Sequence, residues 1–347
     1  MPSRALAALA ERVWTGHGVA EQIARAALAP LSVAFRGAVA VRDELYAAGV
    51  FPAQEAELPT ISVGNLTVGG TGKTPVTAWI AQRLRERGGS PAVVLRGYGG
   101  DEHLVHARLD PSILVIADAD RGAGVQAARR RGADVAVLDD AFQHRRLRRA
   151  ADVVLVAADG WTGTVRLLPA GPWREPLSAL RRADVAVVTR KAVSPERAVH
   201  VASALGEYLA HPAAVVHLAA SGLRSVGGVD ELPLESMAGV AILAVAGVGD
   251  TGAFFGQLRA AGARVDAVPF PDHHAYSAAD ARRLAERADA AGRRVVCTLK
   301  DAVKLEPLWP AGAPQLHYVS QAVIVDRGGE ALGAVLDQVL RARPTAR

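Results

Sequence analysis

The chain has 347 residues, one cysteine, and 40 Lys plus Arg against 35 Asp plus Glu, for a formal net charge of +5. This length suits two α/β domains, and a half-hydrophobic composition excludes a largely disordered chain. The lone Cys297 excludes an internal disulfide and a cysteine metal cage, and favours a reducing compartment such as the cytosol.

The positive charge is carried mostly by arginine, which favours a phosphorylated substrate or acidic lipid headgroups. We expect no nucleic-acid partner, because there is no zinc-finger spacing, basic coiled coil or basic patch interleaved with aromatic residues. The short apolar run at residues 5–10 ends at Glu11, too soon for a secretory signal.

The first predicted element is an amphipathic helix at residues 20–49, interrupted by Pro30. Only ten uncharged residues separate Arg25 from Arg36, fewer than the roughly 18 to 20 that a spanning helix needs. We therefore expect no membrane span. Two interpretations stay open: an interfacial helix whose arginines reach lipid phosphates, and a packing helix of a soluble protein.

After Pro59, apolar strands alternate with helical stretches, which predicts a parallel sheet with helices on both faces. Residues 1–58 form the expected N-terminal helical segment, 59–224 a core, 225–235 a Gly- and Pro-containing linker, and 236–347 a smaller α/β domain. The predicted strands are 60–63, 92–95, 113–116, 135–138, 153–156 and 185–188 in the core, and 240–246, 264–268 and 294–298 in the smaller domain.

A glycine-rich turn follows the first strand in ISVGNLTVGGTGKTPV, residues 61–76. Backbone N–H groups in such a turn, together with the N-terminus of the next helix, bind phosphate. Thr67 stands where the usual pattern has its first glycine, but the strand before and the helix after favour a phosphate loop over a structural turn. The residues expected to bind nucleotide are Val68, Gly69, Gly70, Thr71, Gly72, Lys73 and Thr74, with the lysine directed to the phosphates and Thr74 to Mg²⁺.

Two carboxylates, Asp139 and Asp140, follow the strand 135–138 in VAVLDDAFQH. Acidic residues on a strand near a phosphate loop are typical of a Mg²⁺ site. The alternative is a pair of helix-capping aspartates. The phosphate loop upstream favours the metal.

Two competing nucleotide motifs are not supported. VVTRKAV has Thr189 and Ala192 where guanine recognition would place the polar residues of Asn-Lys-x-Asp. GVGDTG fits the dinucleotide pattern G-x-G-x-x-G, but the acidic residue expected at the end of the next strand is missing, since Asp266 lies inside that strand. A tight strand-to-helix turn explains the second motif better.

Two polar clusters follow predicted strands and are candidates for the base that activates an acceptor hydroxyl. RGYGGDEH contains Asp101 and Glu102, and FPDHHAY contains Asp272, His273 and His274. A histidine there could accept a proton, or be oriented by a carboxylate, near physiological pH. Either cluster alone is more typical of loop charges or caps, so the catalytic interpretation depends on both domains closing on the phosphate loop.

Together these motifs resemble those of the tetraacyldisaccharide 4'-kinase family of the lipid A pathway. The stretches ISVGNLTVGGTGKTP, RGYGG, GDE, LDDAFQHRRL, LLPAGPWREP, FPDHHAY and TLKDAVK occur in the family's order, from about Trp14 to Leu305. The leading segment, with APLS and VRDELYAAG, is similar to the membrane-facing N-terminus of that family.

The resemblance implies a P-loop kinase core that transfers the γ-phosphate of ATP, with Mg²⁺, to the 4'-hydroxyl of tetraacyldisaccharide 1-phosphate, giving lipid IVA. It implies peripheral attachment to the cytoplasmic face of a Gram-negative inner membrane, with no obligate protein partner. A substrate with four acyl chains leaves the bilayer at a cost of about 0.8 kcal/mol per methylene, so the enzyme has to come to the membrane.

The resemblance also assigns roles to residues. It implies that Lys73 grips the transferring phosphate, and that Asp101, partnered by His273, activates the sugar hydroxyl, with His274 as a rival. It implies that Thr74, Asp139 and Asp140 bind the metal. For three further motif positions it implies only that they lie near the site and help to bind an anion: Gln143, His144 and Arg174.

The chain departs from the family pattern beside Asp101. A long insertion between the RGYG and GDEP segments is missing here, and Gly100 is shared between the two. His103 replaces a proline, Ala141 a glycine and Leu299 a glutamate. None of these changes removes a proposed catalytic group.

The alternative from another class is a P-loop switch or metal-insertion chaperone, which would hydrolyse ATP slowly and bind a protein partner. Such switch families often carry a lysine at the position of Val68. Its absence, together with the DHH segment in a second domain, favours the kinase.

Overall fold

The computed structural model describes residues 4–97, 101–228 and 231–343, which form two compact units. Unit 1 contains the described residues up to Arg96, those of Ile113–Val216 and those from Val325 onward. Unit 2 contains the described residues of Gly97–Ser112 and His217–Ile324. Both units are α/β, as the sequence predicts.

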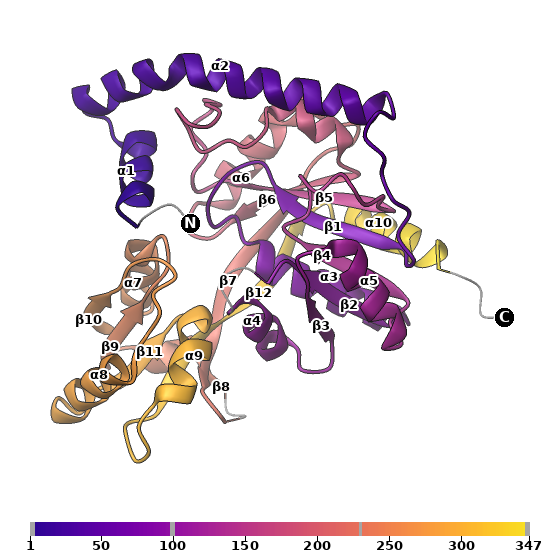
Figure 1. Ribbon diagram of the computed structural model, residues 1–347. Coiled ribbons are helices and arrows are strands. Elements are labelled where there is room, and N and C mark those ends of the chain that lie inside the picture. Colours follow the sequence, from indigo (N-terminus) through magenta and orange to yellow (C-terminus); the bar gives the residue numbers. More distant parts are fainter. Residues whose placement is uncertain (1–3, 98–100, 229–230, 344–347) are drawn as a thin grey trace. The chain divides into compact units, whose positions relative to one another are not determined.

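Unit 1 is built on a parallel sheet whose strands lie in the order β6-β5-β1-β4-β2-β3 (Figure 1). The central strands are buried along their whole length, because helices cover both faces of the sheet. All six strands predicted for the core are present. Their bounds are β1 Thr60–Asn65, β2 Pro91–Leu95, β3 Leu114–Ala117, β4 Val135–Asp139, β5 Ala151–Ala157 and β6 Val185–Arg190.

The helices of unit 1 begin at local sequence signals. Asp120 accepts hydrogen bonds from two backbone N–H groups at the start of α5, and Ser194 caps α6, whose first residue is Pro195. Gly72, which precedes α3, has a left-handed backbone that favours glycine. Their bounds are α3 Lys73–Glu86, α5 Arg121–Arg130, η1 Leu177–Arg182, α6 Pro195–Ala204, η2 Gly206–Tyr208 and α10 Gly329–Arg341.

Two N-terminal helices, α1 (Arg4–Thr15) and α2 (Val19–Ala47), also belong to unit 1 (Figure 1). The predicted interruption at Pro30 is wrong, since α2 continues through it. One cause is tertiary contact just beyond the proline: Ser32 Oγ donates to Leu167 O at 3.0 Å, and Phe35 packs against the core of unit 1. These contacts hold the helix where proline removes one of its internal hydrogen bonds.

The expectation that no segment reaches spanning length is also wrong, because α2 is long and apolar enough to cross a membrane by those two criteria. The apolar stretch between Arg25 and Arg36 is only part of α2, which extends beyond both arginines. Arg25 Nη1 in fact donates to Val13 O at 2.6 Å and Gly16 O at 2.7 Å, so it binds carbonyls at the end of α1. It is therefore not directed to lipid phosphates.

Unit 2 has strands in the order β10-β9-β11-β12-β7, with β8 antiparallel to β7. The three strands predicted for the second domain are β9, β10 and β11. The strand bounds are β7 Ala214–Ser225, β8 Glu231–Pro233, β9 Ala241–Ala246, β10 Arg264–Pro269, β11 Arg294–Cys297 and β12 Leu316–Arg327. The helix bounds are α4 Glu102–Leu109, η3 Leu234–Met237, α7 Thr251–Ala260, α8 Ala278–Ala290, α9 Leu299–Leu305 and η4 Glu306–Leu308.

The compact units differ from the predicted ranges 59–224 and 236–347. The long strands β7 and β12, which the sequence analysis did not single out, each run from one unit into the other. The predicted linker 225–235 contains β8, and the segment with α4 belongs to unit 2. Helix α10 returns to unit 1, where Gln338 Nε2 donates to Ala150 O at 3.0 Å. Gly100, at the missing insertion, lies outside the described residues.

Candidate active site

The turn between β1 and α3 lies at the carboxyl end of β1 and carries the predicted phosphate-binding residues. Gly69 and Gly72 have φ angles of +120° and +85°, a region that residues with a side chain rarely adopt. Lys73 and Thr74 form the start of α3. The glycines thus let the chain turn directly into a helix N-terminus, the arrangement that binds phosphate.

Side chains from β6 and the residues after it support this turn. Thr189 Oγ1 donates to Thr71 O at 2.9 Å, and Lys191 Nζ donates to Gly70 O at 3.1 Å. Val68 remains 44% exposed at the tip of the loop. The carbonyls of Gly70 and Thr71 therefore have partners within the protein, and of the loop N–H groups Val68 N donates to Pro172 O at 2.7 Å and Thr71 N to Gly69 O at 3.1 Å.

Lys73 reaches a group of polar residues that the sequence separates widely. Its Nζ donates to Asn65 Oδ1 at 3.3 Å and lies 3.8 Å from Asp140 Oδ1. Arg174 Nη1 lies 3.3 Å from the same Asp140 oxygen and 3.4 Å from Gln143 Oε1, while Gln143 Nε2 donates to Asn65 O at 2.9 Å. Four predicted site residues therefore meet around Asn65, which the sequence analysis missed although it directly precedes the loop.

The paired aspartates have different surroundings. Asp139 is buried: its Oδ1 accepts a hydrogen bond from Thr77 Oγ1 at 3.1 Å, and its carbonyl accepts one from Arg121 Nη2 at 3.2 Å. Asp140 has a side chain 40% exposed and a positive φ of 47°. Non-glycine residues in this region are uncommon and gather at functional sites.

These residues fit Mg²⁺ better than a metal held in a full protein cage. The described part of the chain has no group of three His, Cys, Asp or Glu side chains placed to hold a metal ion. Mg²⁺ usually keeps several waters and takes one or two carboxylates together with substrate phosphates. Asp139 and Asp140 provide that number beside the phosphate loop, and Thr74 lies at the start of α3 as predicted.

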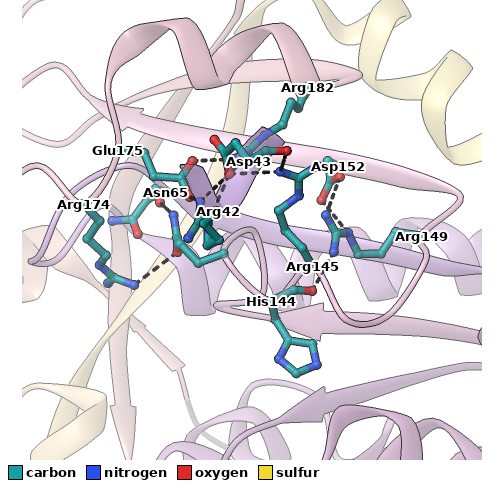
Figure 2. A network of polar contacts seen from close by, with 11 residues as sticks. Arg42, Asp43, Asn65, His144, Arg145, Arg149, Asp152, Arg174, Glu175 and Arg182 are labelled. Carbon is teal, nitrogen blue, oxygen red and sulfur yellow. Dashed lines mark hydrogen bonds and ion pairs between the residues drawn. The ribbon is translucent and has the colours of Figure 1, made fainter. Parts of the chain in front are cut away.

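His144, predicted to help bind an anion, has a lowered pKa. Burial is the largest cause, followed by the positive charges of Arg121 and Arg149. Its backbone carbonyl accepts a hydrogen bond from Arg149 Nη1 at 2.7 Å (Figure 2). A neutral imidazole can hydrogen-bond to a nucleotide, but it adds no positive charge.

A network of ion pairs joins the C-terminal part of α2 to the chain beside this site (Figure 2). Glu175 is fully buried and pairs with Arg42 at 2.7 Å and with Arg182. Asp43 pairs with Arg42 at 2.8 Å and with Arg145 at 2.9 Å. Glu175 and Arg145 directly follow predicted site residues in the sequence, so the network connects the N-terminal helix to the segments that carry them.

In unit 2, Asp101 and His273 come together from segments that are far apart in the sequence. His273 Nδ1 lies 3.8 Å from Asp101 Oδ2, and Lys304 Nζ lies 3.0 Å from the same oxygen. Burial acts to raise the pKa of Asp101, but His273 and Lys304 outweigh it and hold that pKa well below its usual range. The pKa of His273 is raised, chiefly by Asp101.

The neighbouring histidine has other contacts. The His274 ring packs against Phe270 and Tyr276, with ring centroids 4.6 and 4.8 Å apart, and its Nε2 lies 3.5 Å from Asp280 Oδ2. His273 has a positive φ of 53°. The backbone turn at this residue thus separates two adjacent histidines, so that His273 is the one beside Asp101.

The GVGDTG stretch forms the strand-to-helix turn that the sequence favours. It joins β9 to α7, and Asp250 caps the helix by accepting from Ala253 N at 2.8 Å. Asp266 lies inside β10, as expected, and binds Arg287 and Arg293. An aspartate engaged in this way is not the free acidic residue of a dinucleotide site.

Comparison with known proteins decides the family. The family model described as "LpxK: Tetraacyldisaccharide-1-P 4'-kinase" matches residues 24–111 and 100–341. The chain belongs to the tetraacyldisaccharide 4'-kinase family. The tetraacyldisaccharide 4'-kinase of Anaeromyxobacter sp. (strain Fw109-5) is 37% identical over an alignment of 359 residues, covering 95% of this chain and 96% of the relative. That of Halorhodospira halophila is 40% identical over 302 residues, covering 81% and 84%.

A solved structure agrees with this assignment. The "apo" form of LpxK from Aquifex aeolicus, in complex with ATP, matches with a TM-score of 0.73 and 28% identity, covering 91% of this chain and 99% of the relative. The predicted family, α/β fold and kinase class are therefore confirmed. Membership of this family favours a kinase over the switch or chaperone alternative.

Proposed function

We propose that this protein transfers the γ-phosphate of ATP to the 4'-hydroxyl of tetraacyldisaccharide 1-phosphate, giving ADP and lipid IVA in the lipid A pathway. The observation that carries the proposal is the Asp101–His273 pair in a chain of this family whose β1–α3 turn is a phosphate loop. The loop suits the phosphate donor, and the pair suits an acceptor hydroxyl.

On the donor side, the N–H groups of the loop and the side chain of Lys73 bind the β- and γ-phosphates. ATP is the proposed nucleotide because the solved relative is a complex with ATP. Arg174 adds a second cation beside Asp140. Thr74, Asp139 and Asp140 would hold Mg²⁺, which when bound neutralises charge on the phosphates.

On the acceptor side, Asp101 accepts the proton of the 4'-hydroxyl while that oxygen bonds to phosphorus and the bond to ADP breaks. A carboxylate with a lowered pKa is a weak base, but phosphoryl transfer through a loose transition state needs little help from a base before the new bond forms. Before transfer, His273 stabilises the ionised Asp101. After transfer, the proton that Asp101 has accepted lies between Asp101 and His273.

Transfer is tested directly with labelled γ-phosphate, Mg-ATP and tetraacyldisaccharide 1-phosphate in detergent micelles, resolved by thin-layer chromatography. Labelled lipid is expected from the wild type and none from Asp101→Ala, which should still bind ATP. If folded, ATP-binding wild type produced no labelled lipid, the proposed function would be wrong and the switch-like class would lead.

We also propose that the protein attaches to the cytoplasmic face of a Gram-negative inner membrane through α1 and α2. These helices expose large apolar side chains, including Leu9 at 56%, Ile23 at 64% and Val33 at 70%. A pocket of about 630 Å³ lies between α2 and the chain at Val165–Leu167, with Arg36 and Arg166 among its lining residues. Apolar side chains beside exposed arginines suit an interface with anionic lipid.

We propose that α2 lies along this interface and does not cross the bilayer. Ser32 and Phe35, near its middle, contact unit 1, and Arg42 pairs with the buried Glu175. A helix that packs in this way on a water-soluble unit cannot be surrounded by lipid at the same level. The charged side chains of Arg42 and Glu175 would also be costly to place in hydrocarbon.

Co-sedimentation with vesicles containing phosphatidylglycerol tests the attachment. Wild type is expected to bind the vesicles, and Ile23→Glu with Val33→Glu is expected to release the protein. Ile324→Glu is the control, because it changes an apolar side chain of unit 2 that is also exposed, at 48%. Wild type that stays wholly in solution would contradict the proposal.

A further inference from the structure

The Asp101 carboxylate has more polar surroundings than a two-residue pair would give it. It is buried, with a side chain 5% exposed, and it lies at the start of α4. Lys304 Nζ is 3.0 Å from Oδ2, closer than His273 Nδ1 at 3.8 Å. The side chain of Lys304 is 14% exposed and that of His273 is 52% exposed. The lysine is therefore the nearer and more buried of the two cations.

Helix α9 holds Lys304 firmly. Thr298 caps the helix, and the fully buried Asp301 accepts hydrogen bonds from Tyr276 Oη at 2.9 Å and from Gly247 N at 3.1 Å. Gly247 in turn accepts, through its carbonyl, the N–H of His273 at 3.2 Å. The lysine and the histidine thus share one supporting network around Asp301.

The two cations approach one oxygen of the carboxylate. Lys304 and His273 both lie closest to Oδ2 of Asp101, and in the described part of the chain both carboxylate oxygens are buried without a hydrogen-bond partner of regular geometry. Buried polar atoms without partners are uncommon and often mark functional sites. Because both cations approach Oδ2, they hold the carboxylate by one oxygen.

We propose that Lys304 is a positioning residue for phosphoryl transfer: through its ion pair with Oδ2 it keeps the Asp101 carboxylate ionised and fixed in place for the acceptor hydroxyl. The inference rests on the proposed function, in which Asp101 accepts the acceptor proton. A buried carboxylate is unfavourable unless a cation compensates it. The half-exposed His273 provides part of that charge, and Lys304, the nearer and more buried cation, provides the rest.

The test compares Lys304→Met with Lys304→Arg in the full chain. Lys304→Met is expected to lower kcat roughly 10- to 100-fold, part of the range for general base catalysis, without changing KM for ATP. Lys304→Arg keeps the charge and is expected to restore most of the activity. Unchanged kcat in Lys304→Met would overturn the proposal.

The pH profile separates this role from a merely structural one. Without Lys304 the pKa of Asp101 rises, so the acid limb of kcat should move to higher pH. Lys304 and His273 face Asp101, and Asp272 and Lys300 act on His273. Only Lys304 changes in the comparison. A loss of kcat with an unmoved acid limb would contradict the proposal.

Arg108→Met is the matched control. Arg108, on α4, pairs with Glu306 just after α9, so its loss removes another ion pair between the same two segments and leaves Asp101 untouched. It is expected to retain the wild-type pH profile. If Arg108→Met reproduced both effects of Lys304→Met, the lysine would have no special role and the proposal would be overturned.

A second readout does not depend on the lipid. NMR titration of the His273 ring is expected to show a higher pKa in Lys304→Met than in wild type, because a neighbouring positive charge is gone. Lys304→Gln provides the same comparison if the Met variant does not fold. An unchanged His273 titration would overturn the proposal, whereas failure of wild type to phosphorylate the lipid would overturn the proposed function and leave this titration interpretable.

Discussion

The two candidate sites differ in how the chain assembles them. Around the phosphate loop, the main residues lie in two short stretches, 65–74 and 139–143, each beginning at the last residue of a strand. In unit 2, Asp101, His273 and Lys304 come from the start of α4, the loop before α8 and the last turns of α9. The first kind of site is readable as a motif, while the second depends on which distant segments pack together.

The sites also share a feature. Asp140 and His273 have positive φ angles, and no other non-glycine residue in the described part of the chain does. Such a backbone costs energy that the surrounding structure has to supply. In each case the turn separates two adjacent residues of the same type and gives them different environments, one aspartate buried and one exposed, one histidine beside Asp101 and one in an aromatic cluster.

Substitution of Asp101 should have the largest effect and would test whether unit 2 supplies the base. Asp101→Asn is expected to lower kcat about 10²- to 10⁴-fold while ATP binding persists, since the amide cannot accept the proton as a carboxylate does. Single-turnover transfer of labelled phosphate measures it. Asp266→Asn, which disturbs a different aspartate of unit 2, should behave as wild type.

Lys73→Met tests the site that binds the phosphate donor. Loss of a positioned cation at the transferring phosphate is expected to lower kcat/KM roughly 10²- to 10³-fold. The neighbouring cation provides the contrast: Lys191→Met should cost less, because Lys191 contacts the loop carbonyl of Gly70. Steady-state kinetics with varied ATP distinguish the two, and equal losses would show that Lys73 has no special place at the phosphate.

The two histidines of FPDHHAY allow a catalytic role in unit 2 to be compared with a packing role. His273→Gln should lower activity, with a smaller loss of stability near neutral pH than His274→Ala. His274→Ala removes a ring packed on Phe270 and Tyr276 and should destabilise the protein by about 1–3 kcal/mol. Paired denaturation and activity measurements check this. Reversed results would assign the catalytic role to His274.

Stability should also depend on pH through His273. Its pKa is raised above the ordinary value of 6.5, so the stability it contributes is fully present below 6.5 and is lost as pH rises through the raised pKa. The stability difference between wild type and His273→Gln should therefore be larger near about pH 5 than near about pH 9. Urea denaturation at both pH values measures this, and an opposite trend would mean that Asp101 does not favour the charged ring.

The smallest expected effect concerns the support of the phosphate loop. Thr189→Val removes the hydrogen bond to Thr71 O and should reduce the free energy of unfolding by about 1 kcal/mol. KM for ATP should rise modestly while kcat is unaffected, because the loop loses order but no reacting group. A fall in kcat without a change in KM would show that the threonine acts in the transfer itself.

The sequence by itself determined the features that short stretches of chain encode. The phosphate loop, the paired aspartates, the nine predicted strands and the caps of α5 and α6 follow from local patterns, because glycine conformations, capping side chains and strand periodicity act over a few residues. The family followed from the order of these motifs along the chain.

Only the tertiary structure decided the rest. It carries α2 through Pro30, runs β7 and β12 between units that are discontinuous in sequence, separates His273 from His274, and sets Lys304 against Asp101. Each of these outcomes depends on contacts between residues far apart in the chain. Burial and the charges gathered around a buried group, which determine its ionisation, exist only once those distant segments have packed together.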